Sequence, residues 1–256
     1  MLVRTNRAAL MPRLLTRLPI GSQAVADAGD FAPDRIFSIA FCGEDAENSV
    51  IRVKGQRSIV CKDEADLLDA FERNAAYRVA EAARERVFIH SGVVGWRGRA
   101  ILLPGQSCYG KTTLVTRFLE AGATYYSDEY AVLDRQGWVH PYPRSLHIRR
   151  EPGKLTQTVV PFGELGVTGG VGSEPIQPAL MLCCRYRQDA HWQPKPLTAG
   201  AAALELMRFS FTAYWSPEAA FHAAGQTATH VEAWRGRRGE AQPVVEWALK
   251  RLDAGD

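Results

Sequence analysis

The residues from Gly105 to Thr112 follow the pattern Gly-x-x-x-x-Gly-Lys-Thr. This pattern is typical of a phosphate-binding loop, because glycines let the backbone curl so that successive N–H groups face phosphate oxygens. In such a loop the ammonium group of Lys111 would reach the β- and γ-phosphates, and the Thr112 hydroxyl could bind Mg²⁺. The residues expected to bind the nucleotide are Gly105, Gln106, Ser107, Cys108, Tyr109, Gly110, Lys111, Thr112 and Thr113.

The sequence on both sides of this motif supports that interpretation. The apolar run from Ala100 to Pro104 predicts a strand, and apolar residues three and four apart predict an amphipathic helix over 111–121. The motif binds phosphate when a strand leads into the loop and a helix begins directly after it, because the N-terminus of the helix is its positive end. An ordinary glycine turn is the alternative.

Two adjacent carboxylates, Asp128 and Glu129, follow the predicted helix in a segment that has the pattern of a strand. Carboxylates can bind Mg²⁺ and can accept a proton from a hydroxyl group. Most nucleoside triphosphatases with this loop carry their metal-binding aspartate much further along the chain. The short separation from Thr112 therefore favours another group of phosphate-loop enzymes. The alternative is that Asp128 and Glu129 are a solvated strand end without a role in catalysis.

Residues 86 to 150 resemble HPr kinase/phosphorylase, and more closely the bacterial HPr-kinase-related serine kinases found beside peptide-modification genes. That family has a short phosphate loop, a helix and an Asp-Asp or Asp-Glu pair. It also has a His-Gly element before the hairpin that leads to the loop. Here "FIHSGVVGWRGRAILLPG" carries His90, with Ser91 before Gly92. The middle glycine of the family's loop is missing from "GQSCYGKTT".

The resemblance implies an ATP-dependent kinase that transfers the γ-phosphoryl group of ATP to a serine hydroxyl of a protein or peptide. Its catalytic residues would be Asp128, His90 and Lys111, with Asp128 accepting the hydroxyl proton and His90 lying beside it. Thr112 and Glu129 would hold Mg²⁺. The cofactors would be ATP and Mg²⁺, the partner would carry the acceptor serine, and a homo-oligomer is left open.

Other functions remain open, among them a kinase that acts on a small molecule. The chain could hydrolyse nucleotide with water as the acceptor, or it could be a nucleotide-sensing, non-catalytic partner of a peptide-modification complex. The glycine-rich segment at 163–173 predicts a mobile loop that could close over an acceptor. Arginines that could meet the transferring phosphoryl group are Arg144, Arg149, Arg150 and Arg208, with loop or solvent roles as the alternative.

Composition excludes several other classes of protein. The net charge of +3 is too small to argue for nucleic acid, and no apolar run approaches the length of a membrane span. The five cysteines show no zinc-binding spacing, and their odd number fits a reducing compartment. We therefore expect a cytoplasmic protein with neither a nucleic-acid nor a membrane partner.

The predicted fold class is α/β, with an HPr kinase C-terminal-domain-like phosphate-loop fold. It would have a mixed, largely antiparallel sheet, flanking helices and the phosphate loop at one edge. Residues 1–30, rich in arginine, would form an N-terminal arm, with a transit peptide as the minority alternative. Residues 31–256 would form a single HPr-kinase-like nucleotide-binding domain, with strands and a helix in 31–85 and a kinase core in 86–256.

Several further elements follow from local patterns. Turn residues at 96–98 and 135–137 predict two hairpins. The helices predicted after the glycine-rich segment lie near 198–210, 217–224 and 241–252, and the strands at 179–187 and 229–234.

Overall fold

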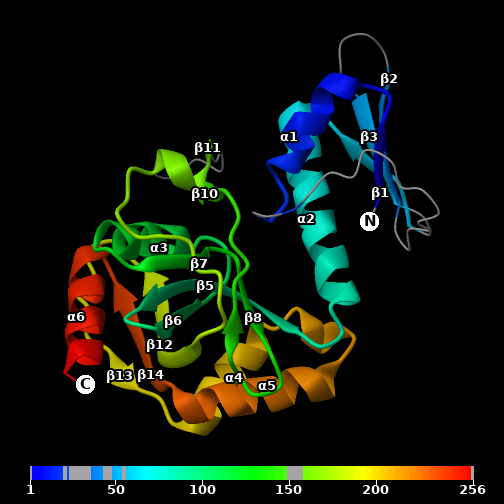
Figure 1. The fold of residues 1–256 in the computed structure, drawn as a ribbon. Coiled ribbons are helices and arrows are strands. Elements are labelled where there is room, and N and C mark those ends of the chain that lie inside the picture. Colours follow the sequence, from blue (N-terminus) through cyan, green and yellow to red (C-terminus); the bar gives the residue numbers. More distant parts are fainter. Residues whose placement is uncertain are drawn as a thin grey trace. The chain divides into compact units, whose positions relative to one another are not determined.

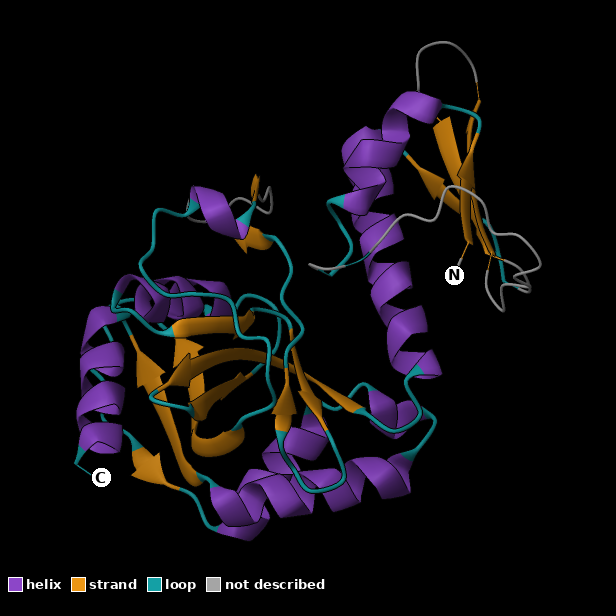
Figure 2. Ribbon diagram, in the orientation of Figure 1, coloured by secondary structure: helices purple, strands orange, loops and turns teal. Residues whose placement is uncertain are grey.

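The computed structural model describes residues 2–19, 22, 36–42, 48–53, 56–148 and 158–254. The chain divides into two compact units, Met1–Ala82 and Ala83–Asp256 (Figure 1, Figure 2). The division falls close to the subdivision expected at residue 85. The sequence predicted a single domain over 31–256, whereas residues 31–82 belong to the first unit and the rest to the second. The reason is that the long helix of the first unit packs against that unit's own strands.

The first unit is a four-stranded sheet with its helices packed against it. Its strands, in spatial order, are β1 (Leu2–Thr5), β2 (Ile36–Cys42), β3 (Asn48–Val53) and β4 (Ile59–Cys61). Its helices are η1 (Ala8–Leu10), α1 (Met11–Leu15) and α2 (Glu64–Ala82). The strands and the helix predicted for 31–85 are confirmed, and β2, β3 and β4 pair antiparallel.

The first residues of the chain belong to this unit rather than to a separate arm. Strand β1 pairs in parallel with β2. Leu10 and Leu14 are 2% and 1% exposed and lie in the same apolar cluster as Phe37 and Phe71. Burial of these leucines is the physical reason that the segment folds onto the sheet instead of fraying. Part of the predicted arm, residues 20–21 and 23–30, lies outside the described residues.

The second unit is built on a mixed sheet. Its strands, in spatial order, are β13 (Lys195–Pro196), β14 (Glu232–Arg238), β12 (Gln177–Tyr186), β6 (Arg99–Pro104), β5 (Val87–Trp96), β8 (Tyr130–Leu133) and β9 (Val139–His140), and β7 (Thr124–Ser127) also pairs with β5. Strand β12 is parallel to β6 and to β14, and the remaining pairs are antiparallel. The α/β class with a mixed sheet is thereby confirmed.

Helices cover both faces of this sheet. Helices α3 (Lys111–Glu120) and α6 (Gln242–Asp253) pack on one face, and α4 (Ala199–Arg208) and α5 (Pro217–His230) pack on the other (Figure 1). The smaller elements of this unit are the strand pair β10 (Leu146–Ile148) and β11 (Thr158–Val160), and the turns η2 (Phe162–Glu164) and η3 (Thr212–Tyr214). Two apolar clusters, one on each face, therefore hold the three layers together.

Strand β6 lies inside the sheet, between β12 and β5. Every residue from Ala100 to Pro104 is buried. An uninterrupted apolar run is what a strand covered on both faces requires. The loop that follows therefore leaves an interior strand, and the expectation that it lies at one edge of the sheet was wrong.

The predicted helices and hairpins of the second unit are present, with one boundary that differs. Helix α5 continues to His230, where the sequence predicted an end near residue 224. Ala224 and Ala228 keep this last part helical by packing in the apolar cluster on that face. As a consequence, the strand expected from residue 229 begins at Glu232.

The glycine-rich segment at 163–173 is packed against β7. The N–H of Tyr125 donates to the carbonyl oxygen of Gly170, and the N–H of Gly172 donates to that of Tyr125, each at 2.8 Å. A Cβ atom at Gly169 would lie 1.9 Å from the carbonyl oxygen of Ala123, and one at Gly172 would lie 2.4 Å from the Tyr126 ring. The glycines permit this close approach, so the expectation of a mobile loop was wrong.

Candidate functional site

The loop from Gly105 to Gly110, called the loop below, curls around the side chain of Lys111. The Lys111 Nζ donates to the carbonyl oxygens of Gly105 and Gln106 at 3.0 and 3.1 Å. Gly110 precedes α3 with φ at +82°, a left-handed conformation that glycine adopts at little cost. Because a glycine stands at this position, no side chain caps the helix, and its first N–H groups can meet a bound anion.

The bulky residue of the loop turns away from the acidic pair. The ring of Tyr109 packs against the apolar cluster on the α4 face and meets Phe209 edge-on, with ring centroids 6.5 Å apart. Gln106, Ser107 and Cys108 are exposed. Tyr109 in place of a small residue therefore leaves the inside of the loop open.

A buried arginine supports the loop from β14. Arg238 is 2% exposed, and its guanidinium donates to the carbonyl oxygens of Gly110 and Gly239, each at 2.8 Å. A Cβ atom at Gly110 would lie 2.2 Å from the same guanidinium. The basic run "WRGRRGE", with Arg235, Arg237 and Arg238, predicts a solvated turn, with phosphate or partner contact as the alternative. That turn is absent, because the three arginines lie on β14 and Arg238 is buried.

Asp128 and Glu129 lie in the break between β7 and β8, both of which pair with β5. The Ser127 hydroxyl oxygen accepts from the N–H groups of Glu129 and Tyr130 at 3.2 and 3.0 Å. Such a side-chain turn competes with the regular strand ladder. The two carboxylates thereby meet different neighbours, although they are adjacent in sequence.

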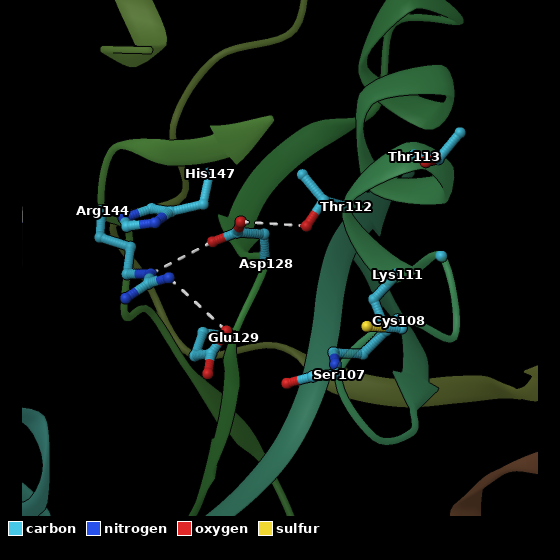
Figure 3. A pocket seen from close by; sticks show the side chains of 10 residues that line it. Ser107, Cys108, Lys111, Thr112, Thr113, Asp128, Glu129, Arg144 and His147 are labelled. Atoms are coloured by element: carbon cyan, nitrogen blue, oxygen red, sulfur yellow. Dashed lines mark hydrogen bonds and ion pairs between the residues drawn. The ribbon is translucent and has the colours of Figure 1, made fainter. Parts of the chain in front are cut away.

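Asp128 points toward the start of α3 and is 1% exposed (Figure 3). The Thr112 hydroxyl donates to its Oδ2 at 3.4 Å. The Tyr125 hydroxyl and the Arg144 Nε donate to its Oδ1 at 3.2 and 3.3 Å. Burial of Tyr125, together with the charge of Asp128, raises the pKa of that phenol well above its usual value, so the hydroxyl stays a donor.

Glu129 points toward His90 in the first half of β5. Its Oε1 lies 3.3 Å from the His90 Nε2, and its Oε2 lies 3.5 Å from the Arg144 guanidinium. Burial alone would raise the pKa of Glu129, but the hydrogen bond from His90 and the charges of Arg144 and Lys111 outweigh it and lower the pKa to about 2. Glu129 is therefore an anion at neutral pH.

His90 lies between the ammonium of the loop and the second carboxylate. Its Nε2 is 3.0 Å from the Lys111 Nζ as well as 3.3 Å from Glu129. Its backbone oxygen accepts from the N–H of Gly105 at 3.2 Å, which fixes the start of the loop against β5. The expectation that His90 lies beside Asp128 was wrong, because the turn at Ser127 directs Glu129, not Asp128, toward β5.

The electrostatics of the site are shaped by buried charges of both signs. Burial lowers the pKa of Lys111, while the nearby Glu129 and Asp128 partly oppose that effect. Arg144, 8% exposed, contacts both carboxylates and offsets part of their charge (Figure 3). Lys111 and Arg144 together match the charge of the two carboxylates, so these four groups carry no net charge.

Most of the predicted site residues share one cavity. It is lined by Ser107, Cys108, Gly110, Lys111, Thr112, Thr113, Asp128, Glu129, Arg144 and His147 (Figure 3). Gly105 and Gln106 contribute through their backbone oxygens, and Tyr109 faces the other side of the loop. The predicted convergence of the loop and the acidic pair is therefore present, and the roles of these residues stay predictions.

The candidate arginines have different outcomes. Arg144 joins the site, whereas Arg208 is 59% exposed at the end of α4 and lies near Glu205 instead. Arg149 and Arg150 lie outside the described residues. Tyr125 was not predicted. Its place three residues before Asp128 is the one signal in the sequence that could have indicated it.

Neither a scan against family models nor a search of curated proteins finds a match to the chain. Among the helices that the structure describes, none has the length and apolar character needed to cross a membrane.

Proposed function

We propose that the chain is an ATP-dependent serine kinase that transfers the γ-phosphoryl group of ATP to a serine hydroxyl of a protein or peptide. The observation that carries the proposal is the meeting of Lys111, Thr112 and two carboxylates in one cavity at the N-terminus of α3. Positioning and charge neutralisation are most of what phosphoryl transfer asks of a protein.

The donor set of the cavity fits a triphosphate with Mg²⁺. The uncapped first turn of α3 and the Lys111 ammonium suit phosphate oxygens. The Thr112 hydroxyl and the Asp128 carboxylate, 3.4 Å apart, are hard oxygen ligands of the kind that Mg²⁺ prefers. A bound Mg²⁺ would supply charge neutralisation between the β- and γ-phosphates.

We exchange the roles that the sequence suggested for the two carboxylates, which are metal binding and acceptance of the hydroxyl proton. Asp128 lies beside Thr112 and is almost fully buried, so we assign it, rather than Glu129, to the metal with Thr112. Glu129, with 30% of its side chain exposed and His90 beside it, is the carboxylate that an incoming hydroxyl can reach. His90 is then a positioning residue for Glu129.

In the proposed reaction the serine oxygen forms a bond to the γ-phosphorus while the bond from that phosphorus to the departing ADP oxygen breaks. Glu129 orients the hydroxyl and takes its proton as the new bond forms. Lys111 and Arg144, which line the same cavity, would offset the negative charge on the transferring group.

The experiment that tests this function uses γ-labelled ATP, Mg²⁺ and an array of serine-containing peptides. The proposal predicts label on serine, and loss of that label in Lys111→Met. Release of free phosphate without labelled peptide would support a nucleoside triphosphatase instead. ATP binding without either product would support a nucleotide-sensing partner, and no ATP binding at all would refute all three.

Three companion proposals come from the same resemblance. The second unit would have the HPr kinase C-terminal-domain-like phosphate-loop fold, which its interior loop strand and flanking helices suit. The chain would act in the cytoplasm, in keeping with the free thiols of Cys61, Cys183 and Cys184. Its partner would be the protein or peptide that carries the acceptor serine.

A further inference from the structure

Four arginines from three elements meet on the α4 face of the sheet, next to the loop. They line one cavity with a volume of about 320 Å³, which we call the arginine cavity. Its charged lining residues are Arg185 of β12, Arg208 of α4, Arg235 and Arg237 of β14, and Glu205 of α4. Pro104 and Tyr109 form the wall that it shares with β6 and the loop.

The strand register explains why the arginines gather here. Cys183 of β12 stands opposite Arg235, and Arg185 stands opposite Arg237. Since alternate residues of a strand face the same side, all three arginines project on the face where Cys183 is buried. Like charges on directly opposed residues destabilise a sheet. An anion bound between them would remove that cost.

The single acid of the cavity compensates only part of this charge. Arg235 donates to Glu205 at 2.6 Å, and Arg208 lies 3.9 Å from the same carboxylate. Arg185 lies over the ring of Tyr109. Within the described part of the chain, Arg185 and Arg237 make no ion pair, so the cavity presents two guanidinium groups to a ligand.

The shape of the basic surface indicates an extended ligand. A second cavity shares Arg235, Gly236 and Arg237 with the first, and its other charged lining residues are Arg187, Lys195 and one acid, Asp189. Together the two cavities form a strip along the ends of β12 and β14. Ligands of open α/β sheets bind at the carboxyl ends of parallel strands, which is where this strip lies. It shares no lining residue with the cavity of Lys111 and Asp128.

We propose that this strip docks an acidic segment, with several Asp or Glu side chains, of the protein substrate. Guanidinium groups bind carboxylates through two parallel hydrogen bonds, and a row of them suits an extended acidic chain better than a single small ion. The statement that this ligand is a substrate rests on the kinase function proposed above. The statement that the strip binds an acidic chain does not depend on that function.

The test measures fluorescence anisotropy of a short fluorescein-labelled peptide of Glu and Gly residues. We expect the unmodified protein to bind it at low salt, with an affinity that falls as salt rises. Arg235→Glu combined with Arg237→Glu should weaken binding by about tenfold or more, since like charges then oppose the peptide. The matched control, Arg117→Glu with Arg135→Glu, makes the same charge change at two exposed positions elsewhere and should keep the affinity.

Several outcomes would overturn the docking site. They are the absence of peptide binding at low salt, an equal loss in the control protein, or tighter binding of a single-stranded DNA oligonucleotide than of the peptide. A loss of ATP affinity with unchanged peptide affinity would assign the strip to the nucleotide and would also refute it. Arg235→Gln with Arg237→Gln repeats the test if the double Glu protein does not fold.

The two proposals can fail separately. If the unmodified protein binds no ATP but binds the acidic peptide as expected, the kinase function fails and the docking site stands. If it transfers label to serine but the arginine substitutions leave peptide binding unchanged, the docking site fails and the kinase function stands.

Discussion

The hydroxyl oxygen of Thr112 lies 3.4 Å from the Oδ2 of Asp128, although the two residues are 16 positions apart and belong to different elements. Thr112 stands in the first turn of α3, and Asp128 stands in the break between β7 and β8. A hydroxyl and a carboxylate held in this way would offer a metal ion two oxygen ligands next to the N-terminus of a helix. The proposed metal-assisted phosphoryl transfer depends on this relationship.

Replacing Asp128 or Glu129 by its amide should distinguish metal binding, proposed for Asp128, from proton acceptance, proposed for Glu129. Asp128→Asn removes the charge beside Thr112, so we expect ATP to bind with little response to Mg²⁺, and transfer to fall by orders of magnitude. Glu129→Gln should keep the Mg²⁺ response of ATP binding and still lose transfer. Calorimetric titration with and without Mg²⁺ measures both, and the reverse pattern would restore the assignment expected from the sequence.

Removal of Arg144 should destabilise the folded second unit. Its guanidinium is the cation beside the buried Asp128, and loss of one partner of a buried ion pair costs about 3–5 kcal/mol. Arg117, 48% exposed in its ion pair with Glu120, is the matched control, and its loss should cost about 1 kcal/mol or less. Urea denaturation of Arg144→Met and Arg117→Met makes the comparison, and equal costs would contradict this structural role.

The lowered pKa of Glu129 predicts how stability depends on pH. Its pKa falls from the usual 4.5 to about 2 on folding, so the folded state favours the carboxylate. The stability that it confers is present above pH 4.5 and is lost as pH falls toward about 2. Melting temperatures of the unmodified protein should therefore fall more steeply over this range than those of Glu129→Gln. Parallel curves would show that the carboxylate gains nothing from His90 and Arg144.

The packing of the glycine-rich segment can be tested with two neighbouring alanine substitutions. Gly172→Ala places a Cβ atom 2.4 Å from the Tyr126 ring and should cost about 1–3 kcal/mol of stability. A Cβ atom at Gly170 would have no neighbour within 4 Å, so Gly170→Ala should change stability by about 0.5 kcal/mol or less. Equal effects in thermal denaturation would mean that the segment does not pack on β7.

Local patterns in the sequence were enough to predict the elements that carry the site. The apolar run of β6 and the periodicity of α3 each reflect burial that one element imposes on its own residues. The sequence also predicted that the acidic pair lies near the loop. The connection after α3 is short, so the strand that follows runs back toward the start of that helix.

The partners of each carboxylate could not be predicted in the same way. Which neighbour Asp128 meets depends on a turn made by the Ser127 hydroxyl, and the position of Arg144 depends on the path of the chain after β9. The glycine-rich segment was misread because glycine marks both a flexible loop and a close approach of two backbones, and sequence alone does not separate these.

The most direct test of the central claim is the affinity of the protein for ATP, measured by calorimetry with Mg²⁺ and with a chelator. The account predicts binding at one site, an affinity that falls when Mg²⁺ is removed, and a loss of about tenfold or more in Lys111→Met. Lys250→Met, on the exposed side of α6, should bind like the unmodified protein. An unmodified protein that binds no ATP, or a Lys111→Met protein that binds it equally well, would contradict the claim.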